Sequence, residues 1–276
     1  MAILLKGKPV AQAIKEATAA FAVQYPLTMA IIQIGNDEAG TAYRNFKKKQ
    51  ATLLGIKVQE FLFDDQAKQD EISRCIDMLN NDTDITGIFV EQPLPKNISS
   101  ELLQTIHPEK DIDGITRINA GKLYLNEDGL RPATAEAILA TCDHYGIDFT
   151  GKRVVVIGRS NVVGKPVAMM IIHRHGTVTV CHSKTKDLAS VTREADILIA
   201  AVGQPNFITG NFVKDGVILL DAGYNVVGDV TFGDVDFASI EPKASMITPV
   251  PGGIGTVTNA IIFRNLVKAF DLQRLR

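Results

Sequence analysis

Tyr43 and Lys47 are the first residues along the chain whose types and spacing suggest chemistry. They stand four residues apart in the segment Thr41–Lys49, so they would lie side by side on one face of a helix. An aromatic ring beside an ammonium group can hold a flat heterocycle and supply a proton donor or a base. A solvated, lysine-rich helix with a tyrosine at its edge would show the same residues.

Two loops in the same half of the chain carry acidic residues. Glu91 follows the apolar run Ile85–Val90 and opens a loop that two prolines make rigid. Asp111 and Asp113 are two residues apart, so they would point in opposite directions from an extended backbone. A carboxylate can accept two N–H bonds from an aminopyrimidine edge, although a rigid turn and solvated loop acids would also explain these segments.

A glycine turn in the second half indicates a phosphate cradle. The β-branched run Val154–Ile157 ends at Gly158, and the apolar stretch Val167–Ile172 follows Gly164. A strand, a glycine turn and a helix N-terminus together present N–H groups and positive partial charge to a phosphate. The spacing departs from G-x-G-x-x-G, and any strand–turn–helix corner would look similar.

The next strand indicates which dinucleotide the cradle would take. Thr177–Cys181 leads into His182, Ser183 and Lys184. An NAD site usually has an acidic residue here, which binds the ribose 2′-hydroxyl. Donors and positive charge, with Arg159 available from the first turn, suit a 2′-phosphate, so the sequence favours NADP.

The elements that would position these residues form two α/β series. Apolar runs at Ala195–Val202 and Gly216–Ala222 each lead into a glycine, as at the strand ends of a dinucleotide fold. An earlier series alternates strands and helices over residues 8–90, and the helix Ala133–Tyr145 would link the two. The expected earlier strands are Leu27–Ile34, Ile56–Phe63 and Ile85–Val90, and the expected helices are Lys8–Tyr25, Thr41–Lys49 with its stop at Gly55, and Lys68–Asn80, with a last helix over Thr258–Leu272.

Composition narrows the functional classes. A chain of 276 residues with 46% hydrophobic content can bury a large core in one or two domains. A formal charge of −2 gives no electrostatic footprint for nucleic acid or an anionic membrane, and no apolar run has the length of a membrane span. Three widely spaced cysteines favour a reducing cytoplasm and show no metal-ligand spacing. No signal peptide is expected.

In combination, six segments make the chain resemble the bifunctional methylenetetrahydrofolate dehydrogenase/cyclohydrolase family along nearly its whole length. No single motif is decisive, but six in one order are very specific. They are Tyr43–Lys47, Val90–Pro95, Pro108–Gly114, Gly158–Pro166, Cys181–Thr185 and Thr248–Gly255.

The resemblance implies an oxidoreductase and hydrolase of one-carbon metabolism. Such enzymes oxidise 5,10-methylenetetrahydrofolate by hydride transfer to NADP and then hydrolyse the methenyl product to 10-formyltetrahydrofolate, which links them to purine biosynthesis. They are usually homodimers, and we expect a cytoplasmic one. We predict a folate-binding catalytic α/β domain over residues 1–120, completed by a helix over 256–276, and an NADP-binding Rossmann-like domain with a parallel sheet over 121–255.

The resemblance also implies roles for individual residues. Lys47 would be the catalytic lysine, Tyr43 would stack on the folate, and Asp113 would bond the amino and ring N–H groups of the pterin. Pro251, Gly252 and Gly253 would line the folate cleft. The cofactor site would comprise Gly158, Arg159, Ser160, Val163, Gly164, Pro166, His182, Ser183, Val202 and Gly203, with the phosphate end held by Arg159, Ser160, His182 and Ser183. No metal site is expected.

Glu91 is the departure from the family pattern that matters most. The family has a glutamine there, which contacts the catalytic lysine. A carboxylate would stabilise the ammonium and raise the pKa of Lys47, so hydride transfer would survive while cyclohydrolase activity falls. A Glu91 that points elsewhere would have no effect. Other departures stand at Gly40, Gln92, Pro132–Ala135, Ala222, Tyr224 and Gly255–Thr258.

Two other functional classes stay open. One is a non-catalytic relative that binds folate or a dinucleotide, and binding without turnover would identify it. The other is a different two-domain NADP dehydrogenase, such as a shikimate dehydrogenase-like enzyme, which a substrate panel would distinguish. The Tyr43 and Lys47 pair and the Pro251–Gly253 loop argue against the second class.

Overall fold

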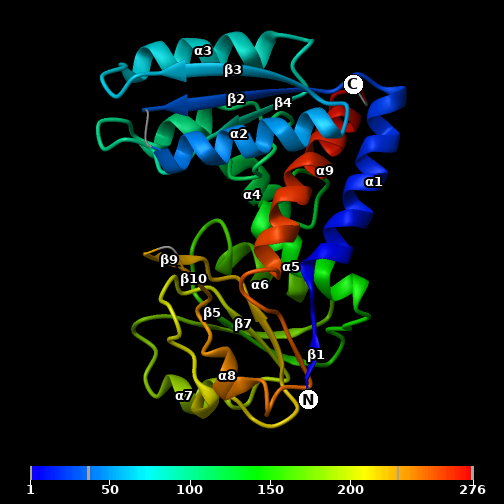
Figure 1. The fold of residues 1–276 in the computed structure, drawn as a ribbon, viewed down its shortest axis with the longest axis vertical. Coiled ribbons are helices and arrows are strands. Elements are labelled where there is room, and N and C mark those ends of the chain that lie inside the picture. Colours follow the sequence, from blue (N-terminus) through cyan, green and yellow to red (C-terminus); the bar gives the residue numbers. More distant parts are fainter. Residues whose placement is uncertain (1, 36–37, 229, 275–276) are drawn as a thin grey trace. The chain divides into compact units, whose positions relative to one another are not determined.

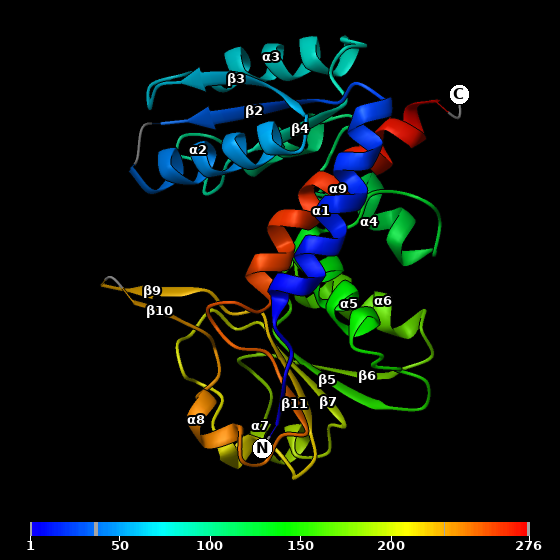
Figure 2. The same ribbon diagram turned by 45° about the vertical axis from the view of Figure 1, so that its right-hand side comes forward.

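The computed structural model describes residues 2–35, 38–228 and 230–274 (Figures 1 and 2). The chain forms two compact α/β units. The 132–261 unit also contains residues 1–13, and the 14–131 unit also contains residues 262–276. The division falls inside α1 (Gly7–Gln24) and α9 (Ile254–Arg274), so both helices contribute to both units. The predicted fold class, two α/β domains with parallel sheets, is confirmed.

A three-stranded parallel sheet forms the centre of the 14–131 unit, in the order β3-β2-β4. All seven residues of the central strand are buried, as expected of a strand covered on both faces. These strands were predicted to within two residues. Their bounds are Thr28–Ile34 for β2, Lys57–Phe63 for β3 and Gly87–Val90 for β4.

Helices α2 (Glu38–Leu53) and α3 (Gln69–Asn81) cover the two faces of this sheet (Figure 1). An apolar stripe of α3 shares one core with Ile32 and its even-numbered neighbours in β2. The odd-numbered Gln33 instead accepts a hydrogen bond from Arg44 of α2. Because alternate strand residues point to opposite faces, the β2 sequence sets which helix each residue meets.

The segment that carries Asp113 runs beside β4. The N–H of Ile88 donates to the carbonyl of Lys110 at 2.7 Å, and Ile88 forms a parallel bridge with Asp111. From α9, the side chain of Asn265 donates to the carbonyl of Ile112 at 2.9 Å. Sheet edge and helix together anchor this segment. The remaining elements of the unit are a 3-10 helix at Ser100–Thr105 and α4 at Arg117–Tyr124.

The 132–261 unit contains a six-stranded sheet whose strand pairs are all parallel, in the order β1-β11-β8-β7-β5-β6. The chain passes from β5 outward to β6 and then returns to β7 on the other side of β5. Ligands of open α/β sheets bind at such a reversal, outside the carboxyl ends of the strands. The bounds are Ile3–Leu4 (β1), Arg153–Ile157 (β5), Thr177–Cys181 (β6), Ile197–Ala200 (β7), Ile218–Asp221 (β8) and Met246–Ile247 (β11).

Helix and hairpin elements complete this unit. The sequence predicted α5 and α6 but not the short elements, which carry too few residues for a periodic signal. The helices are α5 (Ala133–His144), α6 (Gly164–Ile172), α7 (Leu188–Thr192) and α8 (Phe237–Ile240), with a 3-10 helix at Gly210–Phe212. An antiparallel hairpin joins β9 (Asn225–Val227) to β10 (Val230–Phe232).

The compact units divide the chain between Arg131 and Pro132. The domain boundary inferred from the sequence lies between residues 120 and 121, and it stays a prediction. The last helix belongs to the 14–131 unit only from Ile262 onward. None of the described helices is long and apolar enough to cross a membrane.

Candidate active site

Lys47 forms the centre of a buried cluster in the 14–131 unit. Its Nζ lies 3.0 and 3.1 Å from the two carboxylate oxygens of Glu91. The same Nζ stands 3.2 Å from the ring centroid of Tyr43, one turn earlier on α2, and 4.2 Å from that of Phe89 in β4. Only 1% of the Lys47 side chain is exposed. A lysine that was one of three in a row is thus enclosed by a carboxylate and two rings.

Glu91 owes its position to the end of β4. Its backbone N–H donates to the carbonyl of Ile32 at 2.9 Å, which extends the pairing of β2 and β4 by one residue. The Gln92–Pro93 peptide bond that follows is cis. The carboxylate is turned into the protein, with 6% of the side chain exposed. Glu91 therefore faces Lys47, as the sequence analysis expected.

Burial dominates the proton affinity of Lys47. Desolvation lowers its pKa to about 8, and the charge and hydrogen bonds of Glu91 and the charge of Asp113 oppose this shift. The expected effect of Glu91 on the pKa is present. The pKa of Lys47 nevertheless lies below its ordinary value, because the loss of water around a buried ammonium outweighs the carboxylate. A neutral fraction of Lys47 exists near neutral pH.

Asp111 and Asp113 differ in burial and in hydrogen bonding. Asp111 is 1% exposed and accepts hydrogen bonds from the N–H of Thr116 at 2.8 Å and the side chain of Asn119 at 3.0 Å. Asp113 is partly buried, and burial together with Asp111 raises its pKa to about 7, with Lys47 lowering it and Glu91 raising it. Asp111 is a structural residue, and Asp113 titrates near neutral pH.

The cluster combines groups suited to acid–base chemistry. Lys47 and Asp113 have pKa values of about 8 and about 7, shifted toward each other by burial. Groups with such values are the effective proton donors and acceptors at physiological pH. The half-exposed Tyr43 ring, 40% accessible, adds a flat apolar surface beside them.

The glycine turn of the 132–261 unit has the close packing of a phosphate cradle. Gly158 has φ +125°, and a Cβ there would lie 2.1 Å from the carbonyl oxygen of Ala201. A Cβ on Gly164 would lie 2.1 Å from the carbonyl oxygen of Gly158. Only glycine fits either position, so α6 starts with its backbone N–H groups close against the turn. These features fit a dinucleotide phosphate.

Ser160 has a local role that the sequence analysis missed. Its Oγ accepts hydrogen bonds from the N–H groups of Val163 at 3.1 Å and Gly164 at 3.4 Å. It therefore holds the turn that leads into α6, while Arg159 beside it is exposed. Its predicted contact with phosphate remains compatible with this position.

His182 lies in a tight turn after β6, next to the glycine turn. The N–H of Gly158 donates to the carbonyl of Cys181 at 2.9 Å, which brings the ends of β5 and β6 together. His182 Nδ1 accepts from the N–H of Lys184 at 3.1 Å, so the proton of a neutral ring resides on Nε2. With the exposed Ser183, this edge offers the donors predicted for a 2′-phosphate.

Two further predicted loops lie in the same unit. Val202 and Gly203 follow β7, and their N–H groups donate to the buried carboxylate of Asp234, a residue that the sequence analysis did not single out. The loop with Pro251, Gly252 and Gly253 follows β11. Its Val250–Pro251 bond is cis, and the carbonyl of Gly252 accepts from the N–H of Gly7 at 2.8 Å. The described positions contain no cluster of His, Cys, Asp or Glu that could hold a metal.

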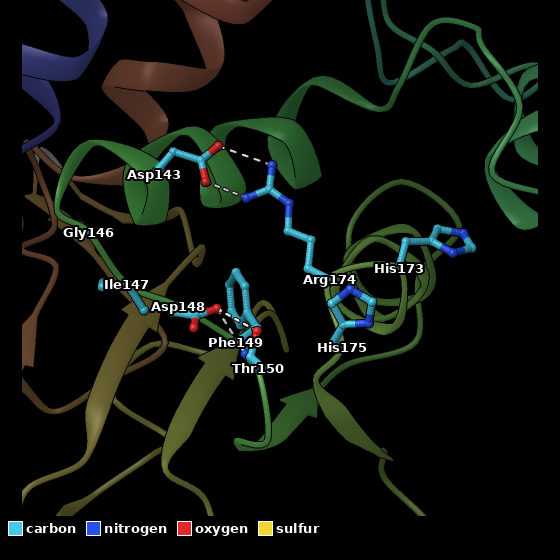
Figure 3. A pocket seen from close by; sticks show the side chains of 9 residues that line it. All are labelled: Asp143, Gly146, Ile147, Asp148, Phe149, Thr150, His173, Arg174 and His175. Atoms are coloured by element: carbon cyan, nitrogen blue, oxygen red, sulfur yellow. Dashed lines mark hydrogen bonds and ion pairs between the residues drawn. The ribbon is translucent and has the colours of Figure 1, made fainter.

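An open hollow elsewhere in the unit includes none of the predicted site residues. It lies between the ends of α5 and α6, where Arg174 forms a two-point ion pair with Asp143 (Figure 3). Its lining consists of Asp143, Gly146, Ile147, Asp148, Phe149, Thr150, His173, Arg174 and His175. Arg174 is thus paired with a carboxylate inside the hollow.

The chain matches two family models: the tetrahydrofolate dehydrogenase/cyclohydrolase catalytic domain over residues 5–113, and the NAD(P)-binding domain of the same family over residues 132–274. It is 42% identical to the protein named Bifunctional protein FolD from Caldanaerobacter subterraneus, over 97% of this chain and 96% of that one. The solved bifunctional FolD methylenetetrahydrofolate dehydrogenase/cyclohydrolase of Campylobacter jejuni superposes with a TM-score of 0.96 at 37% identity, covering 99% and 100% of the two chains.

The Trypanosoma brucei methylenetetrahydrofolate dehydrogenase-cyclohydrolase, solved with NADP and an inhibitor, superposes with a TM-score of 0.93 at 31% identity, covering 100% of this chain and 99% of that one. The predictions of both activities and of NADP as cofactor are confirmed by these relatives. None of them favours the dehydrogenase-only, binding-protein or shikimate-type alternatives. The chain belongs to the tetrahydrofolate dehydrogenase/cyclohydrolase family.

Proposed function

We propose that Tyr43, Lys47, Glu91 and Asp113 carry both activities of this chain, oxidation of 5,10-methylenetetrahydrofolate and hydrolysis of the methenyl product to 10-formyltetrahydrofolate. The observation that supports this assignment most is the buried Lys47, whose Nζ lies 3.0 Å from Glu91 and against the Tyr43 ring, with its pKa lowered to about 8. A buried lysine whose pKa is shifted by desolvation and by a specific charge partner is typical of a functional site.

Two of these four residues, Tyr43 and Asp113, hold and orient the substrate. Tyr43 stacks on the flat ring of the folate, and Asp113, ionised above about pH 7, accepts hydrogen bonds from the amino and ring N–H groups of the pterin. Pro251, Gly252 and Gly253 present backbone to the substrate. Bound NADP supplies the hydride acceptor, and hydride transfer then requires chiefly proximity and orientation.

Lys47 and Glu91 control charge during both steps. Loss of hydride leaves a positive charge on the methenyl group, and a neutral Lys47 does not oppose it, while the Glu91 carboxylate favours it. In the hydrolytic step, neutral Lys47 accepts a proton from the water that attacks the methenyl carbon, and the resulting ammonium returns it to N5 as the C–N5 bond breaks. The remaining hydroxyl proton leaves to solvent as the formyl C=O forms. Glu91 stabilises the ammonium between these two transfers.

The cofactor residues act through backbone and charge. The turn at Gly158, Val163, Gly164 and Pro166 admits the pyrophosphate to the N-terminus of α6. Arg159, Ser160, His182 and Ser183 hold the 2′-phosphate, and Val202 and Gly203 contact the cofactor beyond it. The closely packed glycines and the donors at the ends of β5 and β6 support this assignment.

An absorbance assay tests the proposal. Purified protein with 5,10-methylenetetrahydrofolate is given NADP or NAD, and NADPH and the methenyl product are followed together. Decay of added methenyltetrahydrofolate above its spontaneous rate reports the hydrolase. Lys47→Gln should abolish the catalysed decay, whereas Lys48→Gln, at the neighbouring and half-exposed lysine, should not. Equal losses in the two variants would refute the role of Lys47.

A homodimer in the cytoplasm, serving one-carbon supply to purine biosynthesis, completes the proposal. Exposed apolar side chains gather on and beside the β9–β10 hairpin, and such patches mark interfaces; they are Tyr224, Val226, Val227 and Val230. Three free thiols suit a reducing compartment. Light scattering should give twice the chain mass, and Val226→Lys should lower it if the hairpin forms the interface.

A further inference from the structure

Two buried carboxylates lie beneath the loops at the carboxyl ends of the strands in the six-stranded sheet. Asp221 is the last residue of β8, and Asp234 follows β10; they are 3% and 0% exposed. The N–H of Asp234 donates to Asp221 Oδ1 at 3.1 Å, so the two residues are direct neighbours. Neither belongs to the site residues assigned so far.

Asp234 binds three consecutive backbone amides of the loop after β7. Its Oδ2 accepts from the N–H of Val202 at 2.6 Å and of Gly203 at 3.0 Å, and its Oδ1 accepts from the N–H of Gln204 at 2.9 Å. The side chain of Asn225 donates to Oδ1 at 3.0 Å. Three consecutive amides on one carboxylate leave this loop little freedom.

Asp221 links the neighbouring strand ends. Its Oδ1 also accepts from the N–H of Gly223 at 2.8 Å, and its Oδ2 accepts from the N–H of Val235 at 3.1 Å. Its own N–H donates to Oγ1 of Thr248 at 2.7 Å. Thr248 begins the segment that continues to Pro251, Gly252 and Gly253. The pair thus connects the loops that follow β7, β8 and β11.

No cation balances these charges within the described part of the chain, because no lysine, arginine or histidine forms an ion pair with either carboxylate. Burial raises the pKa of Asp221 to about 6, with the hydrogen bond from Gly223 opposing the shift and Asp234 adding to it. The surroundings are closely fitted: a Cβ on Gly233 would lie 2.0 Å from Asp221 Oδ2. Buried charge without a partner is costly unless hydrogen bonds satisfy it, and here N–H donors alone do so.

We infer that Asp221 and Asp234 are positioning residues, which hold the Val202–Gln204 loop and Thr248 in the arrangement that the cofactor requires. Asp234 orders the cofactor loop directly, and Asp221 orders both Asp234 and the start of the glycine loop. The inference rests on the proposed cofactor role of Val202 and Gly203.

The number of donors on each oxygen predicts a graded effect. Each oxygen of Asp234 accepts two hydrogen bonds, so Asp234→Asn turns an NH₂ group toward two N–H donors in either orientation. Asp221→Asn can keep its oxygen at the δ1 position, where two donors point, and leave a single donor unpaired at δ2. The first variant should therefore disturb the loop more than the second.

Steady-state kinetics of three variants test the inference. Asp234→Asn should raise the KM for NADP by about tenfold or more and leave the cyclohydrolase rate, measured without cofactor, within twofold. Asp221→Asn should raise that KM less. Asp236→Asn is the matched control, since its half-buried carboxylate has no hydrogen bond or ion pair among the described residues, and it should behave as the unmodified protein. An unchanged KM in Asp234→Asn would overturn the inference.

Two further measurements separate the other outcomes. If the unmodified protein does not reduce NADP, the proposed function fails, which is a different result from a normal enzyme with an insensitive Asp234→Asn. If Asp234→Asn does not fold by circular dichroism, Asn225→Ala removes one of the four donors instead. It should raise the KM for NADP severalfold and speed hydrogen exchange at the amides of residues 202–204; no change in either would overturn the inference.

Discussion

Lys47 Nζ lies 3.0 and 3.1 Å from the two carboxylate oxygens of Glu91, and both side chains are almost completely buried. Two effects act on the pKa of Lys47 in opposite directions here. Desolvation favours the neutral lysine, and the carboxylate favours the ammonium. The pKa of about 8 is the balance of the two. The residue at position 91 therefore influences hydrolysis through the pKa of Lys47, without any change in the position of the lysine.

Removing the Glu91 charge should shift the pH profile of hydrolysis. Glu91→Gln takes away the largest influence that raises the pKa of Lys47, so the rising limb of cyclohydrolase activity should move to lower pH. At pH 7 the hydrolytic kcat should increase severalfold, while the dehydrogenase kcat changes less. The measurement is the pH dependence of both activities between pH 6 and 9.

Glu60→Gln is the control for that experiment, because Glu60 also pairs with basic residues of α2, at a more accessible position. It should leave both profiles in place. Equal changes of the two activities in Glu91→Gln would contradict the assigned role of Glu91.

Asp113→Asn should weaken folate binding and stabilise the fold at alkaline pH. The pKa of Asp113 is raised from 3.8 to about 7, so its protonated form is favoured in the folded state. The stability that this proton supplies is complete below about pH 4 and lost as pH rises through 7. An asparagine does not titrate. At about 1.4 kcal/mol per pKa unit, it should raise the free energy of unfolding at pH 8 by a few kcal/mol.

Thermal unfolding at pH 4.5, 6 and 8 checks this expectation. The Tm of Asp113→Asn should exceed that of the unmodified protein at pH 8, and the difference should shrink as the pH falls. A difference independent of pH would mean that the carboxylate is not the cause.

Gly158→Ala should remove cofactor binding while hydrolysis persists. A Cβ at Gly158 would lie 2.1 Å from a backbone oxygen, in addition to the strain of φ +125°. We expect an increase of about a hundredfold or more in the Kd for NADP, since the cradle must open to relieve the contact. Titration calorimetry measures the Kd, and cyclohydrolase activity reports that the rest of the protein is folded.

Gly216→Ala separates backbone strain from close approach. Gly216 has φ +81°, but no atom lies within 4 Å of a Cβ placed there. It should cost stability of about 1 kcal/mol and leave NADP affinity unchanged. A comparable loss of affinity in both variants would show that strain, not contact at the cradle, is responsible.

Arg159→Gln should reduce the preference for NADP over NAD. Arg159 is exposed beside the end of β6, where His182 and Ser183 supply further donors. Loss of the positive charge that Arg159 offers to the 2′-phosphate should raise the KM for NADP by about ten- to a hundredfold. The KM for NAD should stay almost unchanged. Arg153→Gln, at the opposite end of β5 and paired with Glu194, is the control. Parallel changes for both cofactors would exclude a 2′-phosphate contact.

The main strands and helices could be predicted from sequence because each carries its own signal. Long apolar runs such as Thr28–Ile34 and Val154–Ile157 bury both faces of a strand, and glycine turns mark where they end. The hairpin of β9 and β10 was missed because each strand has only three residues, too few for a sequence pattern. Each strand is held by pairing with the other. The Tyr43 and Lys47 pair was predictable for a similar local reason, since helix geometry alone makes residues four apart neighbours.

The electrostatics of the site depended on tertiary structure. The spacing from Tyr43 distinguishes Lys47 from Lys48 and Lys49, but only the packing of α2 against β4 decides that Lys47 is buried beside Glu91 and Phe89. Asp234 is thirty residues from the loop it binds, so no local pattern could reveal the contact. The sequence by itself determined which elements form and which residues share a helix face or a strand end. Burial decided which charges shift, because desolvation acts through neighbours that are distant in the chain.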